Sequence, residues 1–524
     1  MTNTIGEIEK ADVILMTGSN TTENHPVLSS FVKRAVAYNS AKLIVIDPRR
    51  IKVADFAHHY LRPTLGTDVA WINGMMHVII KENLYDQAFV DGRTEGFEAL
   101  KKVVESYTPE KVEAISGIPA EKLIAAARMY AGAKAGSILY CMGITQHTTG
   151  TDNVKSLANL AMLCGNMGVE GGGVNPLRGQ NNVQGACDFG GLPNVYSAYQ
   201  PVTDAAIRQK MEAAWGVTDL PDKVGLTVTA MIPKAHDGEL KAMYIIGENP
   251  LVSDPDLNHA EKSFRNLDFL VVQDIFMTET AQMADVVFPS TCFAEKDGTF
   301  SNSERRVQRI RKAVDAPGDA RDDWQTLCDI GTRMGYPMAY ESSQDIMEEI
   351  RTVTPSYAGI SYDRIEVEGL HWPCPSEDHP GTPILHTQQF TRGKGLFHSI
   401  EFIPPAETPD DEYPLYLTTG RVLYQYHTGT MTRKTAGLNE RAPENFIEVS
   451  PEDAKTYALT DGAKITIASR RGQIEAVVKI SEKMVAGTIF MPFHFAESAA
   501  NKLTLSLIHI SEPTRQVLVS RMPS

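Results

Sequence analysis

A stretch of twenty residues, 171–190, holds groups that suit the binding of a polar molecule. It contains six glycines, three asparagines, two glutamines and one arginine, and it shows almost no helix or strand periodicity. Glycines let a backbone approach a ligand closely, and amide side chains both donate and accept hydrogen bonds. Arg178 is the only full charge before Asp188 and could hold a small anion. A Gly/Asn-rich surface loop has the same composition, so both interpretations stay open for this stretch alone.

Two segments far apart in the chain repeat a strand–turn–helix–strand pattern. The turn of the first holds Gly18 and Asn20, and its second strand ends at Asp47. Such a turn admits a phosphate near a helix N-terminus, and the acidic residue can accept ribose or base donors. The counterparts in the second segment are Gly247, Asn249 and Asp274. The expected strands are 11–16, 43–46, 242–246 and 269–272, and the expected helices are 26–38 and 257–265.

The similar spacing in the two segments indicates an internal pseudo-repeat. Two copies in register favour nucleotide binding, although an ordinary α/β turn remains an alternative for either copy alone. Neither copy has the complete Gly-x-Gly-x-x-Gly pattern, which disfavours a nicotinamide dinucleotide.

The elements between and after the two segments complete an α/β fold. A Pro-rich linker is expected near 395–414, and beyond it the apolar period becomes two, which predicts a small, mostly antiparallel barrel. The expected helices are 68–83, 120–133, 151–168 and 451–457, and the expected strands are 137–142, 284–289, 413–419, 464–469, 473–480 and 487–491.

The composition restricts the classes of protein to which the chain can belong. With 524 residues it is too long for one hydrophobic core, so about three domains are expected. No apolar run reaches the roughly 18 residues of a membrane span, and no signal peptide is recognisable. The net charge of -15 argues against nucleic acid as the main partner. Six scattered cysteines without a Cys-x-x-Cys pair predict a reducing, cytoplasmic location and no metal site in the chain.

From residue 1 to about 504, these motifs together resemble the molybdopterin-dependent oxidoreductase family, and within it the formate dehydrogenase catalytic (alpha) subunits. The most specific motif is Gly-Asn-Met-Gly-Val-Glu-Gly-Gly-Gly-Val-Asn-Pro-Leu-Arg-Gly-Gln-Asn-Asn-Val-Gln-Gly-Ala-Cys-Asp at 165–188. Weaker motifs at 271–278, 284–291 and 418–432 occur in the order of the family. The resemblance implies two molybdopterin guanine dinucleotides around one molybdenum, which would explain two nucleotide-binding halves.

The resemblance also implies a set of cofactor contacts. Those of the first half are Gly18, Asn20, Asp47, Arg49, Gly66 and Asp68. Those of the second half are Gly247, Asn249, Ser253, Gln273, Asp274, Ser290 and Asp323. Further cofactor positions are Met142, Gln146, Gly179 and Gln180, of which the last two would lie beside the metal. The C-terminal contacts are Arg421, His427, Thr428, His494 and Asn501. For the two histidines, ordinary structural imidazoles remain an alternative.

The implied reaction is the oxidation of formate to carbon dioxide, with Arg178 as the catalytic residue. Its guanidinium would hold the formate carboxylate through two charge-assisted hydrogen bonds and align the C–H bond. Two electrons would pass through molybdenum and a pterin to a [4Fe-4S] cluster. The implied partner is an electron-accepting subunit, which could be an iron–sulfur, NAD-reducing or hydrogenase module.

The implied fold has two Rossmann-like halves related by the pseudo-repeat and a C-terminal β-barrel of the six-stranded type. The resemblance places a first pterin-guanine-dinucleotide domain at 1–180, a second at 181–395, a linker at 396–414 and a truncated barrel at 415–504.

The sequence departs from the family at both ends. The family has a cluster-binding cysteine motif and a metal-ligating Cys or selenocysteine before His, and this sequence contains neither. Met1 is therefore expected to be an internal methionine, and the chain alone is expected to be inactive. Residues 505–515 match a translated transposase mosaic-end adapter, so 505–524 are expected to be an artefact. An amphipathic C-terminal strand is the alternative.

Three other functions compete with formate oxidation. A relative acting on nitrate or another oxyanion would share the cofactor, but the string that begins at Arg178 favours formate. A non-catalytic electron-transfer or scaffold subunit would leave the polar groups of 171–190 without partners. A nicotinamide dehydrogenase is disfavoured by the missing glycine pattern.

Overall fold

The chain forms two compact units, and each is discontinuous in sequence. The computed structural model describes residues 1–504, 515–516 and 518–521. The first unit comprises Met1–Gly179, Val252–Asn258 and Ile384–Ser524, and the second comprises Gln180–Leu251 and His259–Pro383. The expected domain boundaries near residues 180, 395 and 414 stay a prediction.

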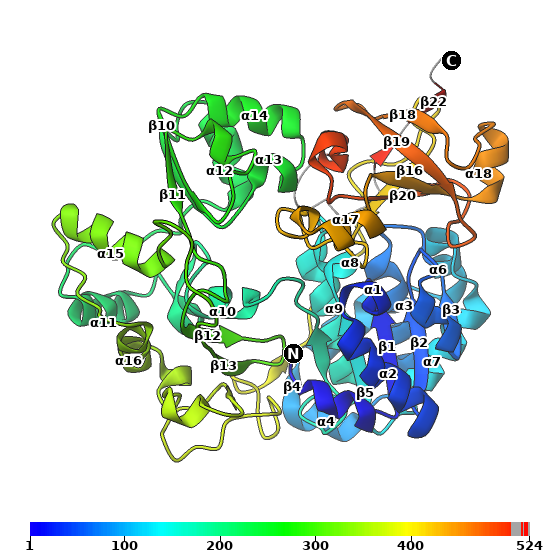
Figure 1. Cartoon of the computed structure of the whole chain (residues 1–524). Coiled ribbons are helices and arrows are strands. Elements are labelled where there is room, and N and C mark those ends of the chain that lie inside the picture. Colours follow the sequence, from blue (N-terminus) through cyan, green and yellow to red (C-terminus); the bar gives the residue numbers. More distant parts are fainter. Residues whose placement is uncertain (505–514, 517, 522–524) are drawn as a thin grey trace. The chain divides into compact units, whose positions relative to one another are not determined.

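A parallel sheet with the strand order β3-β2-β1-β5-β6 forms the centre of the first unit (Figure 1). All five residues of β1 are buried, as is typical of parallel strands that are covered on both faces. The strands are β1 (Val13–Thr17), β2 (Lys42–Ile46), β3 (His59–Leu61), β5 (Gly136–Tyr140) and β6 (Val174–Pro176).

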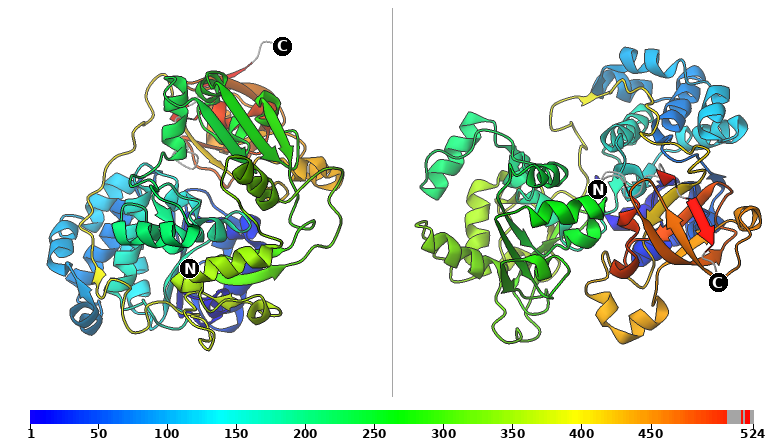
Figure 2. Two further views of the ribbon diagram at one scale, coloured as in Figure 1. Left: turned by 90° about the vertical axis from the view of Figure 1, so that its left-hand side faces the viewer. Right: turned by 90° about the horizontal axis from the view of Figure 1, so that it is seen from above.

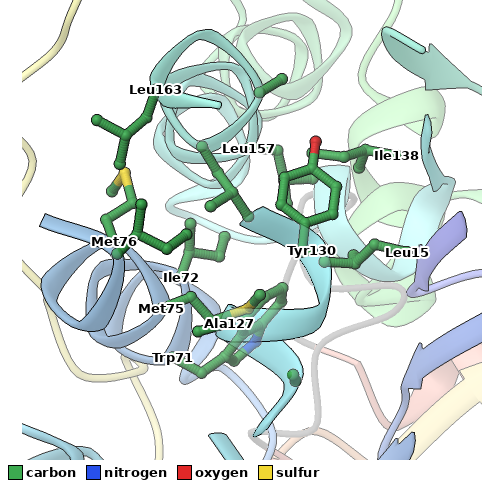
Figure 3. Packing of buried hydrophobic residues seen from close by; sticks show 14 of the residues in the cluster. Leu15, Trp71, Ile72, Met75, Met76, Ala127, Tyr130, Ile138, Leu157 and Leu163 are labelled. Carbon is green, nitrogen blue, oxygen red and sulfur yellow. The ribbon is translucent and has the colours of Figure 1, made fainter. Parts of the chain in front are cut away.

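Helices cover both faces of this sheet because successive strand residues point to opposite sides. Ile14 of β1 belongs to an apolar cluster with Val32 of α2 (Pro26–Tyr38). Its neighbour Leu15 belongs to the cluster on the other face, where Trp71 and Leu157 lie (Figure 3). Three helices contribute to that second cluster: α3 (Asp68–Lys81), α7 (Ala120–Ala131) and α9 (Gly150–Leu163).

Shorter elements complete this part of the first unit. Thr108 caps α6 (Pro109–Ser116) by accepting the Lys111 N–H, and Pro109 takes the first helical position, where no N–H is needed. Two short strands, β4 (Thr94–Glu95) and β15 (Gly395–Leu396), pair in parallel. The helices are α1 (Thr21–Asn24), α4 (Gln87–Arg93), α5 (Phe97–Val104), α6 (Pro109–Ser116) and α8 (Met142–Thr145).

The C-terminal part of the first unit is a mixed sheet with the order β21-β16-β20-β17-β19-β18-β22. The pairs β16–β20 and β17–β19 are parallel and the other pairs are antiparallel. The strand order has two ends, and closure into a six-stranded barrel stays a prediction. The elements are β16 (Tyr416–Gly420), α17 (Ala436–Arg441), β17 (Phe446–Val449), α18 (Pro451–Thr456), β18 (Lys464–Ala468), β19 (Gln473–Ile480), β20 (Thr488–Pro492), β21 (Arg515–Gln516) and β22 (Leu518–Arg521).

The segment 505–524, which we interpret from the sequence as an artefact, is described only in part. Residues 505–514, 517 and 522–524 lie outside the described residues. The two short strands within the segment pair with β16 and β18. Its interpretation as an artefact stays a prediction.

The second unit contains a parallel sheet with the order β11-β10-β9, whose strands lie side by side in the left view of Figure 2. These strands are β9 (Ala242–Ile246), β10 (Phe269–Asp274) and β11 (Val286–Pro289). An antiparallel sheet consists of β12 (Gly298–Ser301), β13 (Arg306–Ile310) and β14 (Leu370–His371), and β7 (Val195–Tyr196) pairs with β8 (Gln200–Pro201). The helices are α10 (Val183–Asp188), α11 (Ala205–Trp215), α12 (Val228–His236), α15 (Asp323–Arg333) and α16 (Ser343–Val353); the chain passes between units within α13 (Pro250–Ser253) and α14 (Leu257–Arg265).

The Gly/Asn-rich stretch 171–190 is more regular than its composition predicts. It contains β6 and the helix α10. Asn182 precedes α10 with a φ of 58°, and a Cβ on Gly185 would lie 2.2 Å from the Asn182 Oδ1, so glycine permits this tight start. Gln184 Nε2 then donates to Asp188 Oδ1 at 2.7 Å across one helical turn.

Two expected boundaries also move for local reasons. The helix expected to reach residue 168 ends at Leu163, because Gly165 adopts a φ of 69°, which a helix does not accommodate. The strand expected from residue 413 begins at Tyr416, and Pro414, which lacks an N–H for strand pairing, lies outside it. Throughout the described residues, no helix has the length and apolarity of a membrane span.

Candidate functional site

A cavity of about 140 Å³ lies in the first unit at the carboxyl ends of β1, β2, β3 and β5. The turns after these strands line one side, and residues from the ends of β16 and β20 line the other. The carboxyl edge of a parallel sheet is where α/β folds commonly bind ligands. The predicted site residues that line the cavity are Gly18, Asn20, Asp47, Arg49, Gly66, Asp68, Met142, Gln146 and Arg421.

The turn after β1 packs backbone against backbone on the turn after β5. Gly18 has a φ of 55°, and its carbonyl accepts the Gly143 N–H at 3.0 Å. A Cβ on Gly18 would lie 2.6 Å from the Gly143 carbonyl carbon, and a Cβ on Gly143 would lie 2.6 Å from the Gly18 Cα. Both positions therefore require glycine, and the contact fixes the floor of the cavity.

Asp47, directly after β2, is a buried carboxyl group in the cavity wall. Its Oδ1 accepts the backbone N–H of Arg49 at 3.0 Å. Burial raises the pKa of Asp47 to about 7, and nearby Asp68 raises it further, while the Arg49 N–H and the charges of Arg49 and Arg62 oppose the shift. Further hydrogen-bond donors, such as those of a ligand, would stabilise the charged form of this carboxyl group.

The Arg49 side chain pairs with Glu448 of β17. Its Nε and Nη2 donate to Glu448 Oε2 at 3.0 and 2.6 Å, and its guanidinium lies 3.8 Å from the centre of the Phe490 ring. Arg49 is 8% exposed and Glu448 2%. This buried pair joins the turn after β2 to the C-terminal sheet.

Arg421, directly after β16, brings a positive charge to the cavity. Among the described residues no carboxylate lies within ion-pair distance of it, and its Nη2 contacts the Met142 sulfur at 3.2 Å. Burial lowers the pKa of the Arg421 guanidinium. A Cβ on Gly179 would lie 2.5 Å from Arg421 Nη1, so the glycine makes room for this side chain. An anionic ligand would supply the missing negative charge.

Several other polar atoms of the cavity wall are buried without a hydrogen-bond partner among the described residues. They are Ser19 Oγ, Asn24 Oδ1, His25 Nδ1, Thr419 Oγ1 and Arg421 Nε. Buried polar groups are normally satisfied, and leaving one without a partner costs about 1–3 kcal/mol. This concentration around one cavity is expected where a polar ligand binds.

Arg178 lies near the same turns. Its carbonyl accepts a hydrogen bond from His25 Nε2 at 2.7 Å. Burial raises the pKa of the Cys141 thiol, and the Met142 N–H and the positive charges of Arg421 and Arg178 oppose that shift. The predicted anion clamp and the Arg421 guanidinium therefore act on one thiol beside the cavity.

The two predicted histidines of the C-terminal part are His427 and His494. The His494 ring accepts the Val422 N–H at Nε2, at 3.0 Å, and donates from Nδ1 to the His427 carbonyl. Both nitrogens are thus used within the protein, as the structural alternative expects. Burial lowers the pKa of both imidazoles to about 4, so both rings are neutral at pH 7.

The remaining predicted residues of the first unit make contacts with the protein. Asp68 Oδ1 accepts the Trp71 indole N–H at 3.1 Å, and Gly66 has a φ of 76°. Asn501 Nδ2 donates to the carbonyls of Val252 and Ser253, both at 2.9 Å. Thr428 Oγ1 lies 2.9 Å from Thr430 Oγ1, and Ser253 Oγ donates to Asp254 Oδ1 at 3.2 Å. Their cofactor roles stay predictions.

In the second unit, three predicted residues form one hydrogen-bonded cluster at the ends of β10 and β11. Gln273 Nε2 donates to Asp323 Oδ1 at 2.9 Å, and Ser290 Oγ donates to the same oxygen. Lys296 Nζ donates to Asp323 Oδ2 at 3.2 Å. The turns after these strands thus bring together residues separated by up to 50 positions.

The turn after β9 also satisfies its own polar groups. Asn249 Oδ1 accepts the N–H and the hydroxyl of Thr280 at 3.2 and 2.8 Å, and its Nδ2 donates to Glu279 at 2.7 Å. Burial raises the pKa of Asp274, against the opposing effect of two backbone N–H groups. Gly247 has a φ of 64°, and Gln180 is half-buried ahead of α10.

Sequence reasoning missed several residues of the cavity wall. The missed residues are Ser19, Asn24, His25, Cys141, His147, Thr419, Phe490 and Phe493. Ser19, Asn24 and His25 lie in the first predicted turn, so their place after β1 was a usable signal. Glu448 had no such signal, because β17 is four residues long and was not predicted. No group of three or more His, Cys, Asp or Glu residues in the described parts of the chain could hold a metal ion.

Known proteins are similar to this chain in sequence and in fold. Residues 1–333 match the molybdopterin oxidoreductase family, and residues 415–516 match the molydopterin dinucleotide binding domain. The F420-dependent formate dehydrogenase subunit alpha of Methanocaldococcus jannaschii is 52% identical over 508 residues, which are 96% of this chain and 75% of the relative. Formate dehydrogenase H of Escherichia coli is 43% identical over 509 residues, which are 96% and 71% of the two chains.

A solved structure agrees at the level of the fold. Acetylene hydratase from Pelobacter acetylenicus matches with a TM-score of 0.76 at 21% identity, over 99% of this chain and 81% of that one. The chain therefore belongs to the molybdopterin oxidoreductase family.

Proposed function

We propose that this chain is the catalytic (alpha) subunit of a molybdenum-dependent formate dehydrogenase. The cavity in the first unit carries the proposal. Its wall holds the Arg421 guanidinium and several buried polar atoms that have no partner among the residues that the structure describes. The relatives of this chain in Methanocaldococcus jannaschii and Escherichia coli support formate as the substrate. Nitrate and other oxyanions are outcomes of the test below.

The residues of the cavity fit a molybdopterin guanine dinucleotide. The pyrophosphate of such a ligand would neutralise Arg421, and its polar rings would satisfy atoms such as Ser19 Oγ and Thr419 Oγ1. Asp47 would accept N–H donors of the base. The first parallel sheet would then be one Rossmann-like half, and the C-terminal sheet would form the six-stranded-type barrel domain.

We propose that the turns after β9 and β10 form the second Rossmann-like half and bind a second guanosine. Gly247 and Asn249 occupy the turn after β9, and Gln273, Ser290 and Asp323 form one cluster at the neighbouring strand ends. The two dinucleotides would together hold one molybdenum. These assignments follow the family resemblance residue by residue.

The bound molybdenum centre would supply an acceptor for the two electrons of formate oxidation. The reaction converts HCOO⁻ into CO₂, one proton and two electrons. The Arg178 guanidinium would hold both carboxylate oxygens and orient the C–H bond, and it would release the neutral product because CO₂ lacks the charge that arginine binds. Two electrons would then pass to a [4Fe-4S] cluster and an accepting subunit, which we expect in the cytoplasm.

The native enzyme, purified with the subunits that accompany it, tests this function. Formate should reduce a viologen dye, and nitrate should not reoxidise the reduced dye. Arg178→Lys should lower kcat/KM for formate at least tenfold, because lysine cannot form the paired hydrogen bonds of a guanidinium. The matched control is Arg128→Lys, whose native side chain pairs with Glu82 on the surface.

Pterin content separates the possible failures. Equal amounts of the oxidised fluorescent pterin from wild type and Arg178→Lys would show that the variant loses substrate binding and keeps its cofactor. Wild-type protein with pterin and nitrate-dependent activity would overturn the choice of formate. A preparation without pterin would favour the non-catalytic electron-transfer role and overturn the proposal.

A further inference from the structure

The Arg49 charge acts on two buried carboxylates, and its side chain pairs with the one more distant in sequence. Asp47 is two residues away, and the Arg49 charge acts on it. The guanidinium nevertheless donates from Nε and Nη2 to Glu448, which is 399 positions away. Phe490 stacks on the flat face of the guanidinium, so both its edge and its face are held.

The Arg49 guanidinium pairs with Glu448, and among the described residues no cation lies within ion-pair distance of the Asp47 carboxyl. Among the described residues, its side chain accepts the Arg49 backbone N–H and no further hydrogen bond. Burial dominates its surroundings and raises the pKa of Asp47 to about 7. Asp47 therefore has acceptor capacity that remains to be satisfied, at a position where it lines the cavity.

We propose that Glu448 is a positioning residue that keeps Arg49 from pairing with Asp47, and so leaves the Asp47 carboxylate to select guanine as the base of the bound nucleotide. This inference rests on the proposed function, because it concerns the base of the dinucleotide in the same cavity. Glu448 acts through Arg49, since its carboxylate pairs with that guanidinium.

The chemistry of the two purine bases explains the selectivity. Guanine presents its N1–H and its 2-amino group side by side, and these two donors match the two oxygens of one carboxylate. Adenine presents the acceptor N1 at the corresponding position, next to the donor of its 6-amino group. A free carboxylate accepts hydrogen bonds from both guanine donors. With adenine it accepts one from the 6-amino group, and the lone pair of N1 repels its other oxygen. An Asp47 paired with Arg49 would lose that discrimination, because its oxygens would already be occupied.

A buried ion pair adds little to the free energy of unfolding. Stability alone therefore does not explain Glu448, whereas a positioning role does. Desolvation offsets most of the attraction between two buried charges, and similar-sized neutral residues often replace such pairs without loss. Removing Glu448 alone is different, because it leaves Arg49 buried without its partner. Asp47, on which the Arg49 charge already acts, is then a carboxylate with which that guanidinium could pair.

Binding of GDP and ADP at about pH 8.5, where the Asp47 carboxyl is ionised, tests the inference on the 524-residue chain produced in a host without molybdopterin. Isothermal titration calorimetry should show that wild type prefers GDP. Glu448→Gln should lower the ratio of ADP to GDP dissociation constants about tenfold, the effect of losing roughly one charge-assisted hydrogen bond. Asp47→Asn should lower the ratio as well, because an amide presents one acceptor and one donor.

The double variant Arg49→Gln/Glu448→Gln distinguishes positioning from a merely structural role. Without the guanidinium, Asp47 is free again, so the GDP preference should return toward the wild-type ratio even if overall affinity falls. The surface variant Glu82→Gln, which breaks the exposed pair with Arg128, should leave the ratio unchanged. Circular dichroism checks that each variant is folded. If Glu448→Gln unfolds, Glu448→Asp replaces it, and its shorter carboxylate should weaken the pair with Arg49 and lower the ratio by less.

The outcomes separate this inference from the proposed function. A wild-type chain that binds GDP no better than ADP overturns the nucleotide assignment of the cavity, and this inference with it. A wild-type preference that Glu448→Gln retains overturns the role of Glu448 alone. A preference lost in Glu448→Gln and not recovered in the double variant also overturns it, because Glu448 would then act on the fold rather than through Arg49.

Discussion

The turns after β1 and after β9 carry the same Gly-x-Asn pattern, and they differ in how their polar groups are satisfied. At the first turn, the Ser19 hydroxyl has no partner among the described residues. At the second, the Asn249 amide is held by Thr280 and Glu279. The repeated pattern therefore accompanies one wall with unsatisfied polar groups and one whose polar groups bond to each other.

The supporting strands differ in the same direction. Every residue of β1 is buried, whereas β9 has a single buried residue, Ile245. A sheet covered on both faces holds its turns rigidly, and a rigid wall can keep polar atoms unsatisfied until a ligand arrives. A ligand at the second turn would instead compete with hydrogen bonds that the protein already makes. Sequence similarity of two binding turns does not predict how ready each is to bind.

The largest difference is expected between alanine substitutions at the two turn glycines. Gly18→Ala should cost about 4 kcal/mol or more, because the new Cβ would lie 2.6 Å from the Gly143 backbone. Gly247→Ala should cost only about 1–2 kcal/mol, since it has the same left-handed φ but nothing within 4 Å of the new Cβ. Hydrogen–deuterium exchange of peptides covering β1 and β9 measures the two local costs.

Equal costs at the two glycines would contradict the comparison. They would mean that the turns after β1 and β5 separate easily and that the first wall is not rigid. Gly437→Ala is a suitable control within the first unit, because nothing lies within 4 Å of a Cβ there and its φ is not positive.

A smaller difference is expected in the pH dependence of stability from the acidic residues at the ends of β2 and β10, Asp47 and Asp274. The folded-state pKa of Asp47 is about 7, above its usual value, so the folded chain binds this proton more tightly than the unfolded chain. The contribution of Asp47 to the free energy of unfolding should therefore fall as the pH rises from about 4 to about 7, by roughly 2–4 kcal/mol. Asp47→Asn should remove this loss, which denaturant unfolding at several pH values measures.

Asp274→Asn is the matched variant in the second unit. Burial raises the pKa of Asp274 too, and the N–H groups of Phe276 and Ile275 stabilise its charged form. Its substitution should change the pH dependence less than Asp47→Asn does. A larger change at Asp274 would place the less satisfied carboxyl group in the second unit and reverse the comparison.

The sequence predicts the framework of these sites well, because apolar runs and turn residues are local signals. The helices expected at 26–38 and 257–265 agree with α2 and α14, and the turn glycines Gly18 and Gly247 both adopt a positive φ. The strand expected at 242–246 agrees with β9. The resemblance to the molybdopterin-dependent family is confirmed by the matches over residues 1–333 and 415–516.

Local sequence patterns did not predict the contacts that leave polar groups available to a ligand. Glu448 lies in a four-residue strand with a charge in its middle, which reads as a loop, and its partner Arg49 is 399 positions away. The helix α10 depends on the left-handed Asn182 and on a side-chain bond between Gln184 and Asp188, in a stretch whose glycines predict irregular structure. Such features follow from tertiary packing, which a single sequence does not display.

The smallest expected effect compares one hydroxyl at each site in the chain without cofactor. Ser290→Ala should cost about 1 kcal/mol, because it removes a hydrogen bond to Asp323. Thr419→Val should cost nothing or stabilise slightly, since the Thr419 hydroxyl is buried without a partner in the described parts of the chain and valine keeps its shape. Thermal unfolding measures both. A Thr419→Val chain that loses as much stability as Ser290→Ala would show that the hydroxyl already has a partner, and the first wall would then be no more ready for a ligand than the second.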